Sequence, residues 1–413
     1  MMHQIVAYSC YRCGSEFPID LPIDSRGCPS CLDAAPSNLR VLYRAPFPAT
    51  FINKDKSHLP SLWRYSERLP FDERRAVSLG EGLTPLLRSE RIGAAIGAPN
   101  FFIKNEGYNP TWSHKDRFST VAVTAAVEAG ASVVATSSSG NAGASLAAYA
   151  ARAGLECVVA TIAGSAGPML SQIQKYGAKI VPFENKQDRW PFLAEGVRRY
   201  GWFATSPYRH PVVGSHPIGI EGYKTLAYEI IEQFHGNVPD WCAFPVCYGD
   251  AIAGAWLGFR ELMTCGMISR MPRLLAAEAH GSLAKALETE ADQIPDMPAS
   301  FNALAISVGA TRSTYQALNA LRASNGIAVP VSNDGLIAFQ ERIAATEGTF
   351  LELSSVMPVA AVATARRQNI IREDESVVAI VTASGLKDID KSVSSKVLPR
   401  FTNIDDAFRH FAN

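Results

Sequence analysis

The sequence predicts an α/β protein made of two open, mainly parallel α/β/α domains, with a small metal-ribbon-like segment at its N-terminus. The 413 residues are enough for two or three domains. A hydrophobic content of 47% and a charged content of 19% are typical of a well-packed globular enzyme. From Lys115 onward, short apolar segments alternate with longer helical segments, which is the pattern of βαβ units around a parallel sheet.

The first set of alternating elements precedes residue 205. Periodic, mostly alanine-rich segments predict helices at 118–128, 142–152, 167–176 and 188–200. Short apolar segments between them predict strands at 132–136, 156–161, 179–183 and 202–204. Glycines directly follow several of the predicted helices, a position at which glycine commonly ends a helix. We therefore expect residues 119–205 to form a small α/β domain.

A second set of elements follows residue 205 and predicts another sheet. The expected helices are 220–234, 251–263, 282–288, 311–323, 334–345 and 354–367. The expected strands are 241–246, 273–277 and 376–381. We expect this set to belong to a large α/β domain formed by residues 43–118 plus 206–413, into which the small domain is inserted.

Two cysteine pairs mark residues 1–42 as a zinc-ribbon-like segment. Cys10-x2-Cys13 and Cys28-x2-Cys31 are separated by fourteen residues. Each pair can place two thiolates on one tight turn, and the two turns together provide a closed tetrahedral site for a structural zinc ion. Two disulfides, or a ribbon that folds without metal, are the alternatives. The remaining cysteines, Cys157, Cys242, Cys247 and Cys265, are expected to be buried thiols, and Cys247 is the candidate exception because it begins a candidate binding loop.

Charge and hydropathy exclude several classes of partner. Lys+Arg and Asp+Glu both number 39, so the formal net charge is zero and gives no support for binding nucleic acid or an acidic membrane. No apolar run approaches the ~18 residues that a membrane span requires. The N-terminus lacks the basic and apolar blocks of a signal peptide. We expect a soluble, cytoplasmic protein whose partner is a small molecule.

Lys115 is the leading catalytic candidate. It precedes a predicted helix, in Asn109-Pro110-Thr111-Trp112-Ser113-His114-Lys115-Asp116-Arg117. The helix macrodipole disfavours a cation at this position but not a neutral amine or imine. The position therefore favours a lysine of depressed pKa, as Schiff-base chemistry requires. A solvated charge near a helix start is the alternative interpretation.

A loop of small polar residues follows the next predicted strand. Ser138-Ser139-Gly140-Asn141-Ala142 lies between strand and helix, where backbone N–H groups bind anions. An ordinary N-capped helix would have the same composition. Together with Lys115, however, the loop predicts a carboxylate site beside a Schiff-base lysine. This combination indicates an enzyme that uses pyridoxal 5′-phosphate (PLP) on an amino acid.

Two further loops follow strands of the second set. Cys247-Tyr248-Gly249-Asp250-Ala251-Ile252-Ala253-Gly254 opens a helix and is a candidate phosphate cradle, although Asp250 would have to point away from a phosphate. Thr382-Ala383-Ser384-Gly385-Leu386-Lys387-Asp388 follows the last valine-rich strand, and a hydroxyl there can bond a pyridine nitrogen. Each loop taken alone is also compatible with an ordinary turn.

These motifs resemble those of threonine synthase and the wider tryptophan-synthase-β-like, fold type II PLP enzymes. The lysine segment is similar to the family's Asn-Pro-Thr-Gly-Ser-Phe-Lys-Asp-Arg, and residues 138–141 to its Ser-Thr-Gly-Asn loop. The segments 81–86, 221–225 and 382–388 resemble its Glu-Gly-x-Thr-Pro-Leu, Glu-Gly-Gln-Lys-Thr and Thr-Gly-His-Gly-Leu-Lys-Asp motifs. The resemblance extends over roughly residues 78–390 and implies PLP fold type II, a PLP cofactor and a homodimer.

The resemblance also implies roles for individual residues. Lys115 would hold PLP as a Schiff base, Asn141 would bond its phenolic oxygen, and Thr382 would face the pyridine nitrogen. His114, which replaces the family's phenylalanine, would lie near the ring. The phosphate would be held by Gly249, Asp250, Ala251 and Ile252. The substrate would be held by Ser138, Ser139, Ala142 and His216.

Departures from the family pattern concern the substrate. Threonine synthases usually carry Asn-Pro-x-Arg-Ile-Glu-Gly, whereas this chain has His216-Pro217-Ile218-Gly219-Ile220-Glu221-Gly222. Arginine is a bidentate partner for phosphate and glycine cannot replace it, so phosphohomoserine is not the expected substrate. Trp112 replaces a glycine and is expected to narrow the pocket, and Ala142 replaces a hydroxyl residue. Arg209, His210 or His216 are candidates to bind a different anion.

The resulting hypothesis is a lyase or synthase in which the freed Lys115 amine removes the α-proton as a general base. A β or γ leaving group then departs, as in a threonine-synthase-like reaction. β-Replacement on an O-activated serine and a serine/threonine dehydratase or racemase reaction are the alternatives within enzymes. Outside enzymes, the alternative is a PLP-free paralogue that serves as a binding module.

Overall fold

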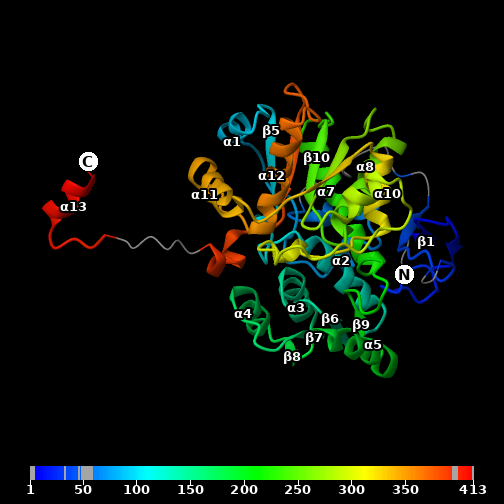
Figure 1. Ribbon diagram of the computed structural model, residues 1–413. Coiled ribbons are helices and arrows are strands. Elements are labelled where there is room, and N and C mark those ends of the chain that lie inside the picture. Colours follow the sequence, from blue (N-terminus) through cyan, green and yellow to red (C-terminus); the bar gives the residue numbers. More distant parts are fainter. Residues whose placement is uncertain (1–4, 32–33, 45–46, 48–58, 393–398, 412–413) are drawn as a thin grey trace.

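The computed structural model describes residues 5–31, 34–44, 47, 59–392 and 399–411. It contains three sheets: a small antiparallel one near the N-terminus, a four-stranded one and a six-stranded one (Figure 1). The two open sheets with helices on both faces confirm the predicted fold class. Among the described residues, no helix combines the length and apolarity that crossing a membrane requires.

The N-terminal ribbon packs against the body of the protein. β1 (Ile5–Cys10) lies between β2 (Glu16–Phe17) and β3 (Leu39–Tyr43), and both pairings are antiparallel. Apolar side chains of β1 and β3 share a core with Trp63 and Val121. The ribbon is thus anchored on the helix that contains Val121 (Lys115–Glu128).

The four-stranded sheet has the order β8-β7-β6-β9, and all its pairings are parallel. Its strands are β6 (Val133–Thr136), β7 (Glu156–Ile162), β8 (Lys179–Phe183) and β9 (Phe203–Ala204). One core contains side chains of α2 (Lys115–Glu128), α3 (Asn141–Ala153) and α4 (Pro168–Lys175), and the other contains those of α5 (Arg189–Tyr200). Every strand predicted for the first set is present. The exact domain boundaries stay a prediction.

The six-stranded sheet has the order β12-β11-β10-β13-β5-β4, and only β4 is antiparallel. Its strands are β4 (Leu86–Arg88), β5 (Phe101–Asn105), β10 (Trp241–Pro245), β11 (Arg273–Glu278), β12 (Ile327–Pro330) and β13 (Val377–Val381). Because side chains alternate along a strand, Cys242 and Phe244 enter one core while Trp241 and Ala243 enter the other. β4, β5 and β12 were not predicted.

Helices cover both faces of this large sheet. One core includes α7 (Lys224–Gln233), α8 (Asp250–Thr264), α9 (Ser282–Glu288) and α10 (Tyr315–Ala323). The other includes α1 (Glu90–Ala95), α11 (Leu336–Glu347) and α12 (Leu353–Arg367). The helix predicted at 220–234 is divided into α6 (Pro217–Ile220), a 3-10 turn at Glu221–Tyr223 and α7. α13 (Ile404–Phe411) lies apart from the body near the C-terminus (Figure 1).

Candidate active site

The predicted motif loops come together where parallel strands of the two sheets end. The segment carrying Lys115 follows β5, and it pairs with the segment after β13: the His114 N–H donates to the Thr382 carbonyl oxygen at 2.8 Å. Ser113 and Ala383 also form an isolated β-bridge. Lys115 is the first residue of α2, and it interacts electrostatically with Asp250 at the start of α8. Open α/β sheets bind ligands at such strand ends.

The Lys115 side chain is half-buried and lines a cavity. Its Nζ atom donates to the Tyr223 hydroxyl at 3.3 Å. Loss of hydration lowers the pKa of Lys115 below its usual value. The carboxylates of Asp250 and Glu352 act in the opposite direction, because they favour the charged amine, but their effect is smaller. A depressed pKa increases the fraction of neutral amine, the form that attacks a carbonyl group or accepts a proton.

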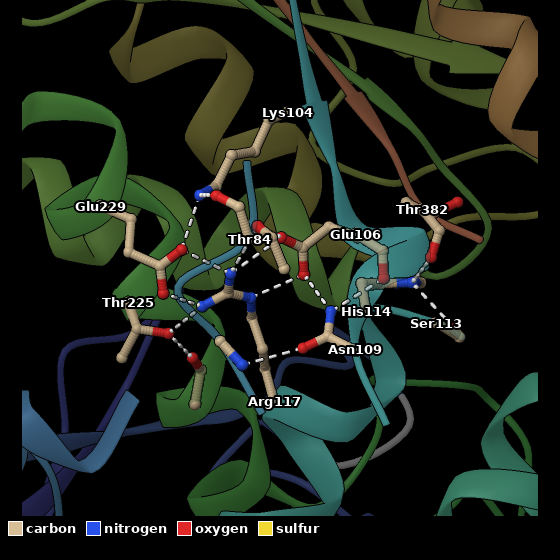
Figure 2. A network of polar contacts seen from close by, with 12 residues as sticks. Thr84, Lys104, Glu106, Asn109, Ser113, His114, Arg117, Thr225, Glu229 and Thr382 are labelled. Carbon is tan, nitrogen blue, oxygen red and sulfur yellow. Dashed lines mark hydrogen bonds and ion pairs between the residues drawn. The ribbon is translucent and has the colours of Figure 1, made fainter. Parts of the chain in front are cut away.

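Behind Lys115 lies a fully buried network of charges (Figure 2). Arg117 donates through Nε to Glu106 Oε2 and through Nη1 to Glu229 Oε1, both at 2.6 Å. Lys104 Nζ donates to the other oxygen of Glu229, also at 2.6 Å. Arg117 and Lys104 therefore neutralise Glu106 and Glu229 through hydrogen-bonded ion pairs of 2.6 Å. Asn109 joins the loop before Lys115 to the network by donating to Glu106 Oε2 at 2.9 Å.

The Asp116 carboxylate also holds the loop that precedes Lys115. It accepts from the Thr111 N–H at 2.7 Å, from the Thr111 hydroxyl at 2.5 Å and from the Ser145 hydroxyl of α3 at 2.6 Å. Burial raises the pKa of Asp116 to about 6, although these hydrogen bonds lower it. Lys115 is thus followed by two residues, Asp116 and Arg117, that fix this loop to the turn after β5, to α3 and to α7.

The serine loop is held open at the start of α3. α3 begins at Asn141 after Gly140, without a side-chain cap. The loop crosses the helix so closely that a Cβ on Gly143 would lie 1.9 Å from the Ser138 carbonyl oxygen. Arg189 and Trp190 of the α5 region bind Ser137 through its carbonyl (2.8 Å) and hydroxyl (3.0 Å) oxygens. The Gly140 N–H donates to the Ser138 hydroxyl at 3.3 Å, and the N–H groups at the uncapped start of α3 are in place for an anion.

Asn141, at the start of α3, is hydrogen-bonded to Glu352. Its Nδ2 atom donates to Glu352 Oε2 at 2.5 Å, while its Oδ1 atom is buried without a partner among the described residues. Glu352 precedes α12 and also accepts from the Ser307 hydroxyl at 2.6 Å. Glu352 was not identified in the sequence. A single acidic residue between Leu351 and Leu353 was the available signal, since buried charges need a partner or a function.

The predicted phosphate cradle forms the first turn of α8. Gly249 has φ +81° and a Cβ there would lie 2.2 Å from the Ala317 Cβ, so glycine is required. Asp250 turns its carboxylate to the Ser215 N–H (3.3 Å) and to Gln316 Nε2 (2.5 Å). No side chain in the described part of the chain caps α8, so the N–H groups of residues 250–252 are available to an anion.

Thr382 and His114 lie against the loop of Lys115. The Thr382 hydroxyl is 3.1 Å from the hydroxyl of Ser355, a residue that the sequence analysis missed. The His114 ring stacks on Tyr223 with centroids 5.4 Å apart, and its Nδ1 atom is 3.3 Å from the Thr382 carbonyl oxygen. Burial holds the pKa of His114 well below its usual value, so the ring is neutral at pH 7.

The histidines proposed to bind an anion lie elsewhere. His216 stacks on Phe203 with ring centroids 4.5 Å apart, and burial lowers its pKa to about 4 although Asp24 favours its charged form. The His210 ring packs on Trp190 at 4.4 Å. The cavity at Lys115 is lined instead by Phe118, Thr136, Ala142 and other neutral side chains. Of the four predicted substrate residues, Ala142 lines this cavity, whereas Ser138, Ser139 and His216 lie outside its lining.

Comparison with known proteins identifies the family. Residues 77–383 match the model of the pyridoxal-phosphate dependent enzyme family. The chain belongs to this family. Threonine synthase of Methanocaldococcus jannaschii is 34% identical over 94% of this chain and 95% of its own length. Threonine synthase of Methanosarcina acetivorans is 34% identical over 92% and 91%, respectively.

Solved structures of other proteins share the fold. Maize serine racemase superposes with a TM-score of 0.62 at 22% identity, over 73% of this chain and 88% of its own. The processed form of threonine deaminase isoform 2 from Solanum lycopersicum gives a TM-score of 0.62 at 19% identity, over 73% and 79%. The predicted fold type II arrangement is thereby confirmed.

The residues around Lys115 fit the PLP cofactor of this family. A lysine amine of lowered pKa, the uncapped helix start at α8 and the unpaired Asn141 Oδ1 atom are grouped at one site. The carboxylate of Asp250 accepts hydrogen bonds from the Ser215 N–H and from Gln316 Nε2, so it is directed at these two residues. Each polar function of the cofactor therefore has a suitable side chain or backbone group in this chain.

The four N-terminal cysteines have the geometry of a metal site. Their Sγ atoms all lie within 4.8 Å of one another, with Cys10 and Cys31 at 3.6 Å and Cys13 and Cys28 at 3.8 Å. Zn–S bonds of ~2.3 Å in a tetrahedron place sulfurs about 3.8 Å apart. A disulfide would require ~2.05 Å. The cluster therefore fits a four-thiolate metal site better than the disulfide alternative.

Proposed function

We infer that this PLP-dependent enzyme is an amino-acid lyase or synthase of the threonine-synthase type, with Lys115 as its catalytic residue. The observation that carries this inference is the Lys115 amine, which combines a lowered pKa with a position at the meeting point of two sheets. Membership of the family disfavours the PLP-free binding module. The similarity to threonine synthases over nearly the whole chain favours elimination or replacement on an amino acid.

The chain's own residues divide the work around the reacting carbon. Lys115 would hold the cofactor through its amine and, once released, would take the α-proton at Nζ. PLP, when bound, supplies the electron withdrawal that makes this proton acidic. The N–H groups at Ser138 and Ser139 would hold the substrate α-carboxylate beside the Lys115 amine. Closure of both domains around the site would exclude water.

The other predicted residues would orient the cofactor. The first turn of α8, from Gly249 to Ile252, would bind its phosphate, and Asn141 would bond its phenolic oxygen. The Thr382 hydroxyl would face the ring nitrogen and leave it unprotonated, since a hydroxyl is a far weaker acid than a carboxyl group. The neutral His114 would lie near the ring face without adding charge.

Borohydride reduction followed by peptide mass spectrometry tests the role of Lys115. Reduction should fix the cofactor on the peptide that contains Lys115 in the wild-type protein. Lys115→Ala should lose this adduct, the visible absorbance of the bound cofactor and turnover, whereas Lys285→Ala, at an exposed lysine of α9, should lose none of them. Undiminished turnover in Lys115→Ala would exclude the assignment.

We also propose that Cys10, Cys13, Cys28 and Cys31 bind one structural zinc ion. The spacing of the pairs and the separation of their sulfurs support this site. Elemental analysis should find about one zinc per chain, lost in Cys28→Ser and retained in Cys265→Ser. Free wild-type thiols without metal after purification under reducing, chelator-free conditions would contradict it.

Assembly and location are proposed from the resemblance and from composition. We propose a homodimer in the cytoplasm that binds an amino-acid substrate and neither nucleic acid nor membrane. Light scattering coupled to size exclusion would measure the mass of the assembly, for which the dimer value is twice the 44.6 kDa of the chain.

A further inference from the structure

Near the Lys115 cavity, a glycine and a phenylalanine ring stand where a phosphate-binding enzyme would need a cationic side chain. Gly219 lies in α6, at the position where threonine synthases usually carry arginine. A Cβ atom on Gly219 would lie 2.4 Å from Cε2 and 2.6 Å from Cζ of Phe118. The Phe118 ring, one helical turn after Lys115, therefore occupies the space into which any side chain at position 219 would grow.

Apart from Lys115, no cationic side chain in the described cavity lining takes the place of the arginine that Gly219 replaces. The other lining residues within the described chain are all neutral: Phe118, Ser119, Thr136, Ala142, Thr205, Ser206, Ser215 and Tyr223. The charged groups that act on Lys115 nearby are the carboxylates of Asp250 and Glu352. A phosphate ester entering this cavity would meet no guanidinium among the lining residues, whereas proteins bind phosphate through cationic donors.

The cavity lining also contains an unpaired hydroxyl. Thr136 ends β6 and is almost fully buried, and its Oγ1 atom has no hydrogen-bond partner among the described residues. The neighbouring Thr205 hydroxyl donates to the Ala135 carbonyl oxygen at 3.2 Å and keeps its lone pairs for another donor. A buried unpaired hydroxyl is costly and is retained where a ligand or water completes it.

We propose that the substrate is an α-amino acid with a short, uncharged side chain that ends in a hydroxyl group, and that phosphate esters are excluded. Phe118 with Gly219 excludes the phosphate, and Thr136 with Thr205 binds the side-chain hydroxyl. This inference rests on the proposed function, because it assumes that the amino acid reacts at Lys115.

The first test titrates the purified, cofactor-loaded enzyme and follows the visible absorbance of the cofactor. The probes are L-serine and L-homoserine, their O-phosphate esters, and L-alanine, which lacks the hydroxyl. One of the hydroxy amino acids should shift the absorbance at a concentration at least about ten-fold lower than alanine and either ester. Tighter binding of an ester, or no response to either hydroxy amino acid, would overturn the proposal while the proposed cofactor site stands.

Two variants separate recognition from a structural role. Thr136→Val keeps the shape of the side chain and should weaken binding of the hydroxy amino acid at least about ten-fold while leaving alanine unchanged. Thr136→Ser should retain tight binding. Equal weakening of both ligands in Thr136→Val would show a structural effect and remove Thr136 from the proposal.

The exclusion of phosphate is tested by exchanging two side chains. Phe118→Ala combined with Gly219→Arg should bind an O-phosphate ester that the wild type does not, whereas Phe118→Ala alone enlarges the cavity without adding a cation and should not. Equal gains in the single and double variants would contradict the role assigned to charge. Absence of any cofactor absorbance in the wild type, even after added PLP, would instead refute the proposed function itself.

Discussion

The two sides of the loop that carries Lys115 are built differently. Behind it, Arg117, Lys104, Glu106 and Glu229 form a buried network in which each charge is paired at 2.6 Å (Figure 2). In front of it, the cavity is lined by neutral side chains, and the Thr136 hydroxyl there is unpaired among the described residues. The rear side is electrostatically complete, and the front side is complete only with a ligand.

This difference shows how one loop serves stability and binding at once. Buried ion pairs contribute little net stability, but the loss of one partner leaves an uncompensated charge and is very costly. Such a network therefore specifies one geometry for the loop. A neutral cavity with an unpaired hydroxyl keeps a binding group available, at the cost in stability of leaving that buried group unsatisfied. Substitutions on the two sides should accordingly have opposite effects on stability and binding.

Breaking the rear network should produce the largest loss of stability. Arg117→Met leaves Glu106 and Glu229 with only Lys104, and we expect a loss of about 3–5 kcal/mol in the free energy of unfolding. Denaturant unfolding measures this loss. The control is Arg198→Met, which removes an exposed pair with Glu195 and should leave the free energy of unfolding nearly unchanged. Similar values for the two variants would contradict the comparison.

Asp116 should make stability depend on pH. Its pKa is raised from 3.8 to about 6 in the folded protein, so the folded state favours the protonated carboxyl. The contribution of this group is present below about pH 4 and is lost as pH rises through about 6, by roughly 3 kcal/mol. Asp116→Asn cannot ionise.

Denaturant unfolding at several pH values tests this dependence. The stability of Asp116→Asn relative to the wild type should increase as pH rises from about 4 to about 6 and then stay constant. A difference between the two proteins that is independent of pH would show that Asp116 does not titrate in this range.

A matched pair of threonines compares the two sides directly. Thr225 belongs to the rear network: its hydroxyl accepts from Arg117 Nη1 at 2.9 Å and donates to the Gly222 carbonyl oxygen at 2.7 Å. Thr225→Val should cost about 1–3 kcal/mol because it leaves buried polar groups unpaired. Thr136→Val should be neutral or slightly stabilising, since it removes an unpaired hydroxyl. Equal destabilisation by both variants would remove the distinction between the sides.

Trp112 gives the smallest expected change. It replaces the glycine of the family motif, has φ +64° and is 46% exposed. Trp112→Gly should relieve backbone strain and stabilise the fold by about 1 kcal/mol. Asn369→Gly is the control at φ +56° and should change stability by only a few tenths of a kcal/mol, because asparagine tolerates this conformation. Thermal unfolding distinguishes the two, and a loss of stability in Trp112→Gly would contradict the strain argument.

Much of the site could be predicted because its residues follow strands. Lys115, the serine loop, the start of α8 and Thr382 each lie just beyond a strand, and parallel strands bring such loops together. Glu352 and Ser355 were missed because they lie at the start of a helix that follows no predicted strand. β5 was missed because Lys104 and Asn105 interrupt its apolar pattern, and Lys104 is buried only because Glu229 pairs with it.

The sequence alone determined the alternation of strands and helices, the order of the motif loops and the choice of Lys115, because these depend on local periodicity and on chemistry within short segments. Only the tertiary structure decided which polar groups are paired. It showed that the Phe118 ring fills the space beside Gly219 and that His216 packs on Phe203 outside the lining of the Lys115 cavity. Steric exclusion and the pairing of buried charges depend on distances between residues far apart in the chain, which a local pattern does not contain.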